Sequence, residues 1–124
     1  MLVGVATIFS VRDLAASVAH YRDVLGFTVT FQYGAPAFYA CLCRDEVAIH
    51  LRAGIGWHPG DGAIAVFVKD VDALYAELIA RGAKVLKPRQ DYDYGMRDFD
   101  VADPDGNQLT FGMETQSAAT ATPN

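Results

Sequence analysis

The chain repeats one pattern of segments twice, and this repeat restricts its possible folds more than any other feature. An apolar segment, residues 5–11, precedes Asp13. Apolar residues then recur with helical spacing at Leu14, Val18, Tyr21 and Leu25. Asp is a preferred N-cap and Gly26 is a typical stop, so we predict a helix here. The segments FTVTFQ, AFYACLC and EVAIHL then predict three strands, which gives the order β-α-β-β-β.

The second half of the chain follows the same order. The segment GAIAVFVKDVDALYAELIARGAKV contains an apolar strand, Asp70 as a helix cap, an apolar helical stripe and Gly82 as a stop. An offset of 57 residues aligns Asp13 with Asp70 and Val11 with Val68. The segments KVLKPRQ, MRDFDVADPDG and NQLTFG then predict three more strands, with DPDG as a turn. Two copies of one module therefore span nearly the whole chain.

We predict a single α+β domain over residues 1–114, built from two βαβββ modules at about 2–54 and 62–114. The strands are expected to form a curved mixed sheet around a cavity. A chain of 124 residues, 52% of them hydrophobic, can bury one core of this size. Residues 115–124 are small and polar, and we expect this tail to be disordered.

Strand alternation assigns two faces to the strands of each module. Thr7, Phe9 and Val11, with Ile64, Val66 and Val68, should lie under the helices. The opposite, concave face should carry Ala6, Ile8, Ser10, Ala48, His50, Arg52, Ala63, Ala65, Phe67, Gln108, Thr110 and Gly112. Many of these side chains are small, so we expect unfilled space there that could receive a ligand.

Charge and composition exclude several classes of function. The net charge is −5 and the ten basic residues are scattered, so nucleic acid binding is not expected. The longest apolar segment, residues 2–9, is too short to span a bilayer, and no secretory signal is recognisable, which predicts a cytoplasmic protein. Cys41 and Cys43 lack the spacing of redox or zinc motifs and fit free thiols in a reducing compartment.

Three segments carry a resemblance to a known family: VRDLAASVAHYRDVLGF, VFVKDVDALYAELIARGAKV and YGMRDFDVADPDGNQLTF. In this order and spacing the chain resembles the vicinal oxygen chelate superfamily, which groups glyoxalase I, extradiol dioxygenases, and fosfomycin and bleomycin resistance proteins. The resemblance implies the glyoxalase/bleomycin resistance fold. It also implies four equivalent strand positions at which the metal enzymes of the family carry His or Glu ligands. Those positions fall here on Ala6, His50, Ala63 and Thr110.

Of these four residues only His50 can ligate a transition metal, which needs about three or four side-chain ligands. We expect His20 at the surface of its helix and His58 in a loop, so that neither completes a ligand set. The prediction is therefore no bound metal and no cofactor.

The bleomycin-resistance branch resembles this chain better. Its proteins lack metal ligands and sequester a drug between two subunits, with aromatic rings stacked on its flat groups. Their aromatic and Gly before Arg-Glu-Phe appear here as residues 94–99, YGMRDF, with Tyr94 where Trp is usual. The resemblance implies a homodimer, with modules paired within one chain or exchanged between two chains. It would act in antibiotic resistance by binding a small, partly planar organic molecule, and we favour binding over catalysis.

Aromatic residues in two loops are the remaining candidates for ligand contact. Carboxylates beside rings in DYDYG, residues 91–95, suit a cationic, partly aromatic ligand, although a solvated loop explains them as well. Trp57 would lie at a dimer interface or pocket mouth, or would cover the core edge. The predicted ligand-binding residues are His50, Arg52, Trp57, Phe67, Tyr92, Tyr94, Gln108 and Thr110. Two alternatives stay open: a metal-dependent lyase, isomerase or dioxygenase of this superfamily, and metal-free catalysis with His50 as base.

Overall fold

The elements of the chain follow the predicted order, βαβββ twice. The structure, a computed structural model, describes residues 1–54, 56 and 58–115. The elements are β1 (Ala6–Ser10), α1 (Leu14–Asp23), β2 (Thr28–Gly34), β3 (Ala37–Arg44), β4 (Val47–Arg52), β5 (Ala63–Phe67), α2 (Val71–Ala80), β6 (Lys84–Asp91), β7 (Met96–Ala102) and β8 (Gln108–Glu114). The α+β fold of two modules is therefore confirmed.

The two helices begin and end where the sequence predicts. The carboxylates of Asp13 and Asp70 each accept a hydrogen bond of 3.0 Å from the backbone N–H three residues further on. These bonds satisfy N–H groups that lack a partner within the helix. After the helices, Gly26 and Gly82 have φ angles of 78° and 89°, a left-handed conformation that favours glycine.

Each module contributes its own four-stranded mixed sheet. The strand orders are β1-β4-β3-β2 and β5-β8-β7-β6, so the two sheets have the same topology. The first strand of each module pairs in parallel with the last one, and the other pairs are antiparallel. The sequence predicts one curved mixed sheet, whereas the structure has two separate mixed sheets of the same topology.

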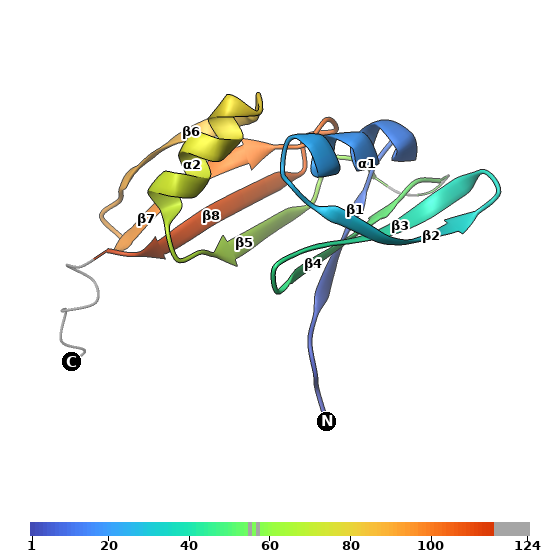
Figure 1. The fold of residues 1–124 in the computed structure, drawn as a ribbon, viewed down its shortest axis with the longest axis horizontal. Helices are drawn as coiled ribbons and strands as arrows, with labels where there is room; N and C mark the ends of the chain where they lie inside the picture. Colours follow the sequence, from blue (N-terminus) through green and yellow to red (C-terminus); the bar gives the residue numbers. More distant parts are fainter. Residues whose placement is uncertain (55, 57, 116–124) are drawn as a thin grey trace.

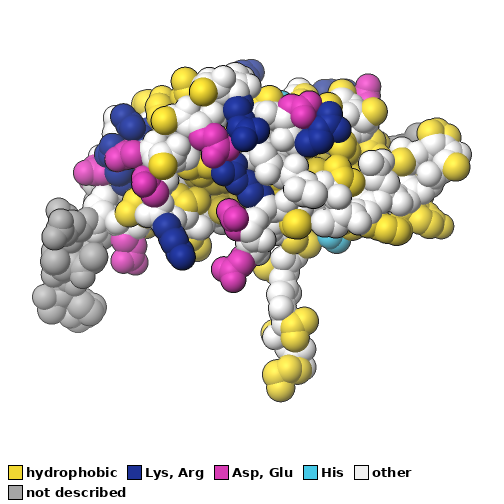
Figure 2. Space-filling model, viewed as in Figure 1, with side chains coloured by type: hydrophobic (Ala, Val, Ile, Leu, Met, Phe, Trp, Pro, Cys, Tyr) yellow, Lys and Arg dark blue, Asp and Glu magenta, His cyan; other side chains and the backbone are white. Residues whose placement is uncertain are grey.

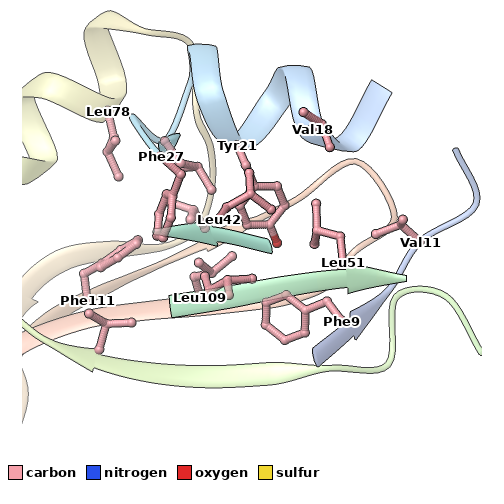
Figure 3. Packing of buried hydrophobic residues seen from close by; sticks show 14 of the residues in the cluster. Phe9, Val11, Val18, Tyr21, Phe27, Leu42, Leu51, Leu78, Leu109 and Phe111 are labelled. Carbon is pink, nitrogen blue, oxygen red and sulfur yellow. The ribbon is translucent and has the colours of Figure 1, made fainter. Parts of the chain in front are cut away.

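Both helices cover the same side of the two sheets (Figure 1). Side chains from both modules form one hydrophobic cluster on that side. Figure 3 shows Tyr21, Phe27 and Leu78 on the helix side of this cluster, above Leu42, Phe9, Leu109 and Phe111. Each fully buried side chain of this size contributes roughly 1.5–3 kcal/mol to stability. The modules are thus held side by side by a shared core.

A buried hydrogen bond connects the two modules. The Tyr21 hydroxyl, on α1, donates to the carboxylate of Asp103 at 2.9 Å. Asp103 lies in the β7–β8 turn, and its carboxylate also accepts backbone N–H groups of Asp105, Gly106 and Asn107 at 2.9–3.0 Å. The DPDG segment is therefore a turn, as predicted, and its first residue anchors the second module to the helix of the first.

The side of the sheets away from the helices is open. Phe9 and Val66 are buried, whereas their neighbours Ile8 and Phe67 are 46% and 80% exposed. This agrees with the face assignment from strand alternation. Figure 2 shows hydrophobic side chains along the lower edge of the molecule, beneath β2 and β3, and on residues 1–5 where they project from β1. Much of the exposed apolar surface therefore lies opposite the helices, although Ile79 on α2 is also exposed.

His20 lies partly inside the protein. The residue is half-buried, and its Nε2 atom is buried and has no hydrogen-bond partner among the described residues. The expected surface position of His20 is therefore wrong.

Most of the tail predicted to be disordered lies outside the described residues. Its first residue, Thr115, donates its backbone N–H to the Gly95 carbonyl at 3.0 Å. Among the described residues, no helix combines the length and the hydropathy needed to cross a bilayer.

Candidate ligand-binding faces

Each module presents one sheet face away from its helix, and we call these surfaces the N face and the C face. The N face includes Ile8, Ser10, Phe31, Tyr33, Tyr39, Cys41, His50 and Arg52. The C face includes Ala65, Phe67, Lys87, Tyr94, Asp98, Asp100, Gln108, Thr110 and Gly112. Because both helices lie on one side (Figure 1), the two faces lie next to each other within the chain and do not close on each other.

His50 lies at the centre of the N face, beside Ile8 on β1 and Cys41 on β3. Its Nδ1 atom lies 2.8 Å from the Tyr39 hydroxyl, and the two rings meet edge to face at 5.5 Å. Burial, and then the nearby Cys41, raise the pKa of the Tyr39 phenol above its ordinary value, against an opposite effect of Arg52. The Tyr39 phenol therefore fixes the orientation of the His50 ring on the N face.

Arg52 lies at the end of β4, between Ser10 and Tyr39 on the neighbouring strands. Its Nε donates to the Ser10 hydroxyl at 3.0 Å. This contact holds the stem of the guanidinium along the sheet surface. The predicted orientation of Arg52 and His50 toward one face therefore agrees with the structure.

The four positions that carry metal ligands in enzymes of the resembling family do not form a metal centre here. Ala6 and Ala63 have no donor atom, and Thr110 donates its hydroxyl to Asp100 at 2.6 Å. The residues directly beside His50 and Thr110 in the first strands are Ile8 and Ala65, which cannot ligate either. Within the described part of the chain, no group of three or more His, Cys, Asp or Glu could hold a metal ion. The side chains at these positions do not fit a transition metal.

Two buried carboxylates define the C face, and the sequence-based list of site residues lacks both. Asp98 and Asp100 alternate along β7 and are 5% and 9% exposed. Asp100 accepts hydrogen bonds from the Thr110 hydroxyl at 2.6 Å and from the Gln108 amide at 3.1 Å. Gln108 and Thr110 thus lie on the predicted face. The alternation in RDFDVA is the signal that could have added the two carboxylates.

Lys87, also absent from the predicted site, is the centre of a second cluster on the C face. Its ammonium lies 2.9 Å from the Asp98 carboxylate and donates to the Tyr94 hydroxyl at 2.7 Å. Tyr94 in turn donates to Asp98 at 2.8 Å. The same ammonium lies 4.1 Å from the centre of the Tyr92 ring, which stacks parallel to the Tyr94 ring at 5.4 Å. We call Tyr92, Tyr94 and Asp98 the cation cage.

The carboxylate beside the two tyrosines is therefore Asp98. Asp91, which the sequence placed with these rings, forms an ion pair with Arg97 at 3.0 Å instead. Arg97 also contacts Asp72 on the helix side of the sheet. Asp91 therefore points to Arg97 and does not line the C face, and Asp93, the other carboxylate of DYDYG, is exposed.

A hollow of about 720 Å³ opens at the junction of the modules, and Phe67 is the only one of the described predicted site residues that borders it. Apolar residues such as Val66, Leu74 and Phe111 line it, together with charged groups. One of these is Arg44, which is paired with Glu77 of α2 at 2.8 Å. This hollow differs from the predicted cavity between the concave faces. Trp57 lies outside the described residues.

Residues 5–111 match the family model of the Glyoxalase/Bleomycin resistance protein/Dioxygenase superfamily. A bleomycin resistance protein of Geobacillus stearothermophilus is 29% identical over 86% of this chain and 93% of its own length. The family match covers most of the chain, and the protein therefore belongs to this superfamily.

Two solved structures share the fold. A glyoxalase/bleomycin resistance protein from Catenulispora acidiphila has a TM-score of 0.77 and 26% identity, covering 92% of this chain and all of the other. The bleomycin-binding protein of Streptomyces verticillus, in complex with copper(II)-bleomycin, has a TM-score of 0.75 and 25% identity, covering 90% of this chain and 95% of the other. These likenesses support the bleomycin-resistance-type branch of the superfamily.

Proposed function

We propose that this protein is a homodimer that binds and sequesters a small, partly planar, antibiotic-like molecule without using a metal. The ligand would lie between the N face of one copy and the C face of the other. The observation that carries this proposal is that both faces present aromatic side chains to solvent on the same side of one chain. Phe31, Tyr33, Phe67 and Tyr94 are each more than half exposed. Monomeric proteins rarely leave such surfaces uncovered, and aromatic rings offer stacking surfaces to planar ligands.

The charges of the two faces favour exchanged pairing of modules between two copies. The N face carries Arg52 and His50, whereas the C face carries Asp98 and Asp100 with Lys87. Placing the N face of one copy on the C face of its partner would bring the Arg52 guanidinium toward the Asp100 carboxylate, while Asp98 is already paired with Lys87. Because the two faces of one chain point the same way, a second copy is the simplest means of enclosing a ligand.

Similarity to proteins of known activity supports the ligand class. The Geobacillus relative is a bleomycin resistance protein, and the Streptomyces structure contains bound copper(II)-bleomycin. The side chains at the four ligand positions support binding without a protein-held metal, because only His50 could ligate and a transition metal needs about three or four such ligands.

Binding is tested by calorimetry and thermal unfolding with bleomycin and a panel of glycopeptide and heteroaromatic antibiotics. A bound ligand raises the unfolding temperature by mass action, by an amount that grows with the logarithm of its concentration above Kd. The proposal would be contradicted if no member of the panel raised the unfolding temperature.

Metal analysis of protein purified without chelator is the companion experiment. Stoichiometric Zn, Ni, Mn or Fe that disappears in His50→Ala would favour a metal-dependent enzyme instead.

Dimer formation through the open faces is tested by Phe67→Asp. Phe67 is 80% exposed, so the substitution should leave the folded chain intact while placing a charge in the proposed interface. Light scattering after gel filtration should show a dimer for the wild type and a monomer for this variant. The matched control is Ile79→Asp, on the exposed surface of α2, which should remain dimeric. A dimeric Phe67→Asp variant would place the interface elsewhere.

A further inference from the structure

The cation cage on the C face is already complete, and its occupant comes from the chain itself. Asp98 provides a carboxylate 2.9 Å from the Lys87 ammonium, Tyr94 provides a hydroxyl at 2.7 Å, and Tyr92 provides a ring face at 4.1 Å. A carboxylate beside an aromatic ring face is the chemistry that recognises organic ammonium groups. The geometry is therefore that of a ligand subsite, with a lysine where a ligand cation would lie.

The two partners of the ion pair differ in burial. The Asp98 side chain is 7% exposed, whereas the Lys87 side chain is 33% exposed. Removing the positive partner of a carboxylate as buried as Asp98 is costly. Lys87 belongs to β6, which is the edge strand of its sheet, and its four-carbon stem is flexible. Lys87 can therefore withdraw into solvent, whereas Asp98 cannot.

We propose that the cation cage is a subsite for an organic ammonium group and that the Lys87 ammonium fills it until a ligand cation displaces it. This inference rests on the proposed function in one respect: the ammonium group belongs to the molecule that the open faces bind. It adds that this molecule is cationic.

Exchange of one cation for another explains why a neutral ligand would be rejected. A neutral group that displaced Lys87 would leave Asp98 without a positive partner in a buried position. A ligand ammonium keeps the charge of the cage unchanged. Burial alone would lower the pKa of Lys87, but hydrogen bonds to Tyr94 and Asp98 raise its pKa above the ordinary value. Lys87 therefore leaves the cage as a cation and does not leave by losing its proton.

Removing the internal occupant is the direct test. Calorimetric or NMR titration with tetramethylammonium would be compared between the wild type and Lys87→Ala. The variant should bind this cation at least about tenfold more tightly, because no lysine competes for the ring face and carboxylate. tert-Butanol, which is neutral and of similar shape, should bind to neither protein. Lys87→Arg is the matched control and should behave as the wild type, since its guanidinium also fills the cage.

A labelling experiment on the wild-type protein decides the question if Lys87→Ala does not fold. The chain has three lysines, Lys69, Lys84 and Lys87. Lys87 should react most slowly with an amine-modifying reagent, and tetramethylammonium should raise its rate severalfold while leaving the other two unchanged. Equal rates with tetramethylammonium and with tert-butanol would overturn the proposal. So would a folded Lys87→Ala variant that binds tetramethylammonium no better than the wild type.

The outcomes separate this inference from the proposed function. The double variant Lys87→Ala, Asp98→Asn should lose the tight tetramethylammonium binding, whatever the antibiotic panel shows. If an antibiotic binds but neither tetramethylammonium nor Lys87→Ala changes its affinity, the cage is not the subsite and the binding function still stands. If tetramethylammonium binds the cage but no antibiotic of the panel binds or raises the unfolding temperature, the antibiotic proposal fails and the cation subsite remains.

Discussion

The N face and the C face occupy equivalent strand positions but differ in chemistry. The paired positions, N face first, are Tyr39 and Asp98, Cys41 and Asp100, His50 and Thr110, and Arg52 and Gly112. On the opposite side of the sheets, both modules bury apolar residues against a helix. The duplication has therefore kept the buried pattern, which helix packing requires, while the open faces have diverged. A surface that packing does not constrain can specialise for a ligand or partner.

The difference divides the proposed site into two parts. The polar groups of the N face are few, and its main polar contact joins Tyr39 to His50. The C face holds two buried carboxylates, each bonded to neighbours on the same sheet. Groups fixed by several hydrogen bonds are held in place before a ligand arrives. The C face is thus preorganised around two carboxylates, and the N face is an aromatic surface that carries His50 and Arg52.

The largest change in the free energy of unfolding is expected at Gly112, a position of the C face without a side chain. A Cβ atom at Gly112 would lie 2.9 Å from the Cβ of Asp98, although the equivalent N-face position carries Arg52. Gly112→Ala should therefore lower the free energy of unfolding by about 2 kcal/mol through overpacking. Urea denaturation measures this change. Gly4→Ala is the control, since a Cβ there meets nothing within 4 Å. An equally stable Gly112→Ala variant would show that Asp98 moves freely and that the C face is not rigid.

A matched pair of substitutions compares the two faces directly. Asp100→Ala removes the acceptor of the Thr110 and Gln108 hydrogen bonds and should cost about 1.5 kcal/mol of stability. Cys41→Ala, at the equivalent N-face position, removes a thiol for which no hydrogen bond is described and should cost about 0.5 kcal/mol. Chemical denaturation of both variants gives the two values. A larger loss in Cys41→Ala would reverse the assignment of the rigid wall to the C face.

Local patterns in the sequence predicted most of the fold, because caps and apolar periodicity are local signals. They also placed His50, Gln108 and Thr110 on the correct faces through strict alternation. Lys87 could not be predicted by strand alternation, because the register between β6 and β7 shifts both before and after this residue. Lys87 therefore meets Asp98 on the C face, while Arg89, two residues further on, pairs with Asp72 of α2.

The arrangement of the modules was also beyond local reasoning. Whether the two concave faces enclose a cavity or lie side by side depends on contacts between distant segments, such as Tyr21 with Asp103. No periodicity in the sequence encodes a pairing of that kind. The half-buried position of His20 has the same origin, since its environment depends on packing beyond its own helix.

The hydrogen bond between Tyr21 and Asp103 connects the two modules and should contribute to stability in a pH-dependent way. Tyr21→Phe removes the hydroxyl that donates to Asp103 and should cost about 1 kcal/mol at neutral pH. Burial, and then Asp103, raise the pKa of Tyr21 in the folded chain. The unfolded chain loses this proton near pH 10, so the Tyr21 contribution to stability is complete below that pH and declines above it. Urea denaturation at neutral and alkaline pH should show a smaller alkaline loss in Tyr21→Phe. An identical alkaline loss in both proteins would contradict this.

The smallest effect is expected for the Tyr39–His50 pair of the N face. Tyr39→Phe removes the hydroxyl beside His50 from a partly exposed position and should change stability by about 0.5 kcal/mol or less. Its consequence should be visible spectroscopically, because burial and then Cys41 raise the pKa of Tyr39. In an ultraviolet titration of phenolate formation, Tyr39→Phe should lose a component that ionises above the ordinary tyrosine range.

Tyr94→Phe is the C-face counterpart, since burial also raises the pKa of Tyr94 while the Lys87 hydrogen bond opposes it. Adding Lys87→Ala should shift the Tyr94 component to higher pH and leave the Tyr39 component unchanged. Equal shifts of both components would mean that the two faces are electrostatically coupled and are not separate halves of one site.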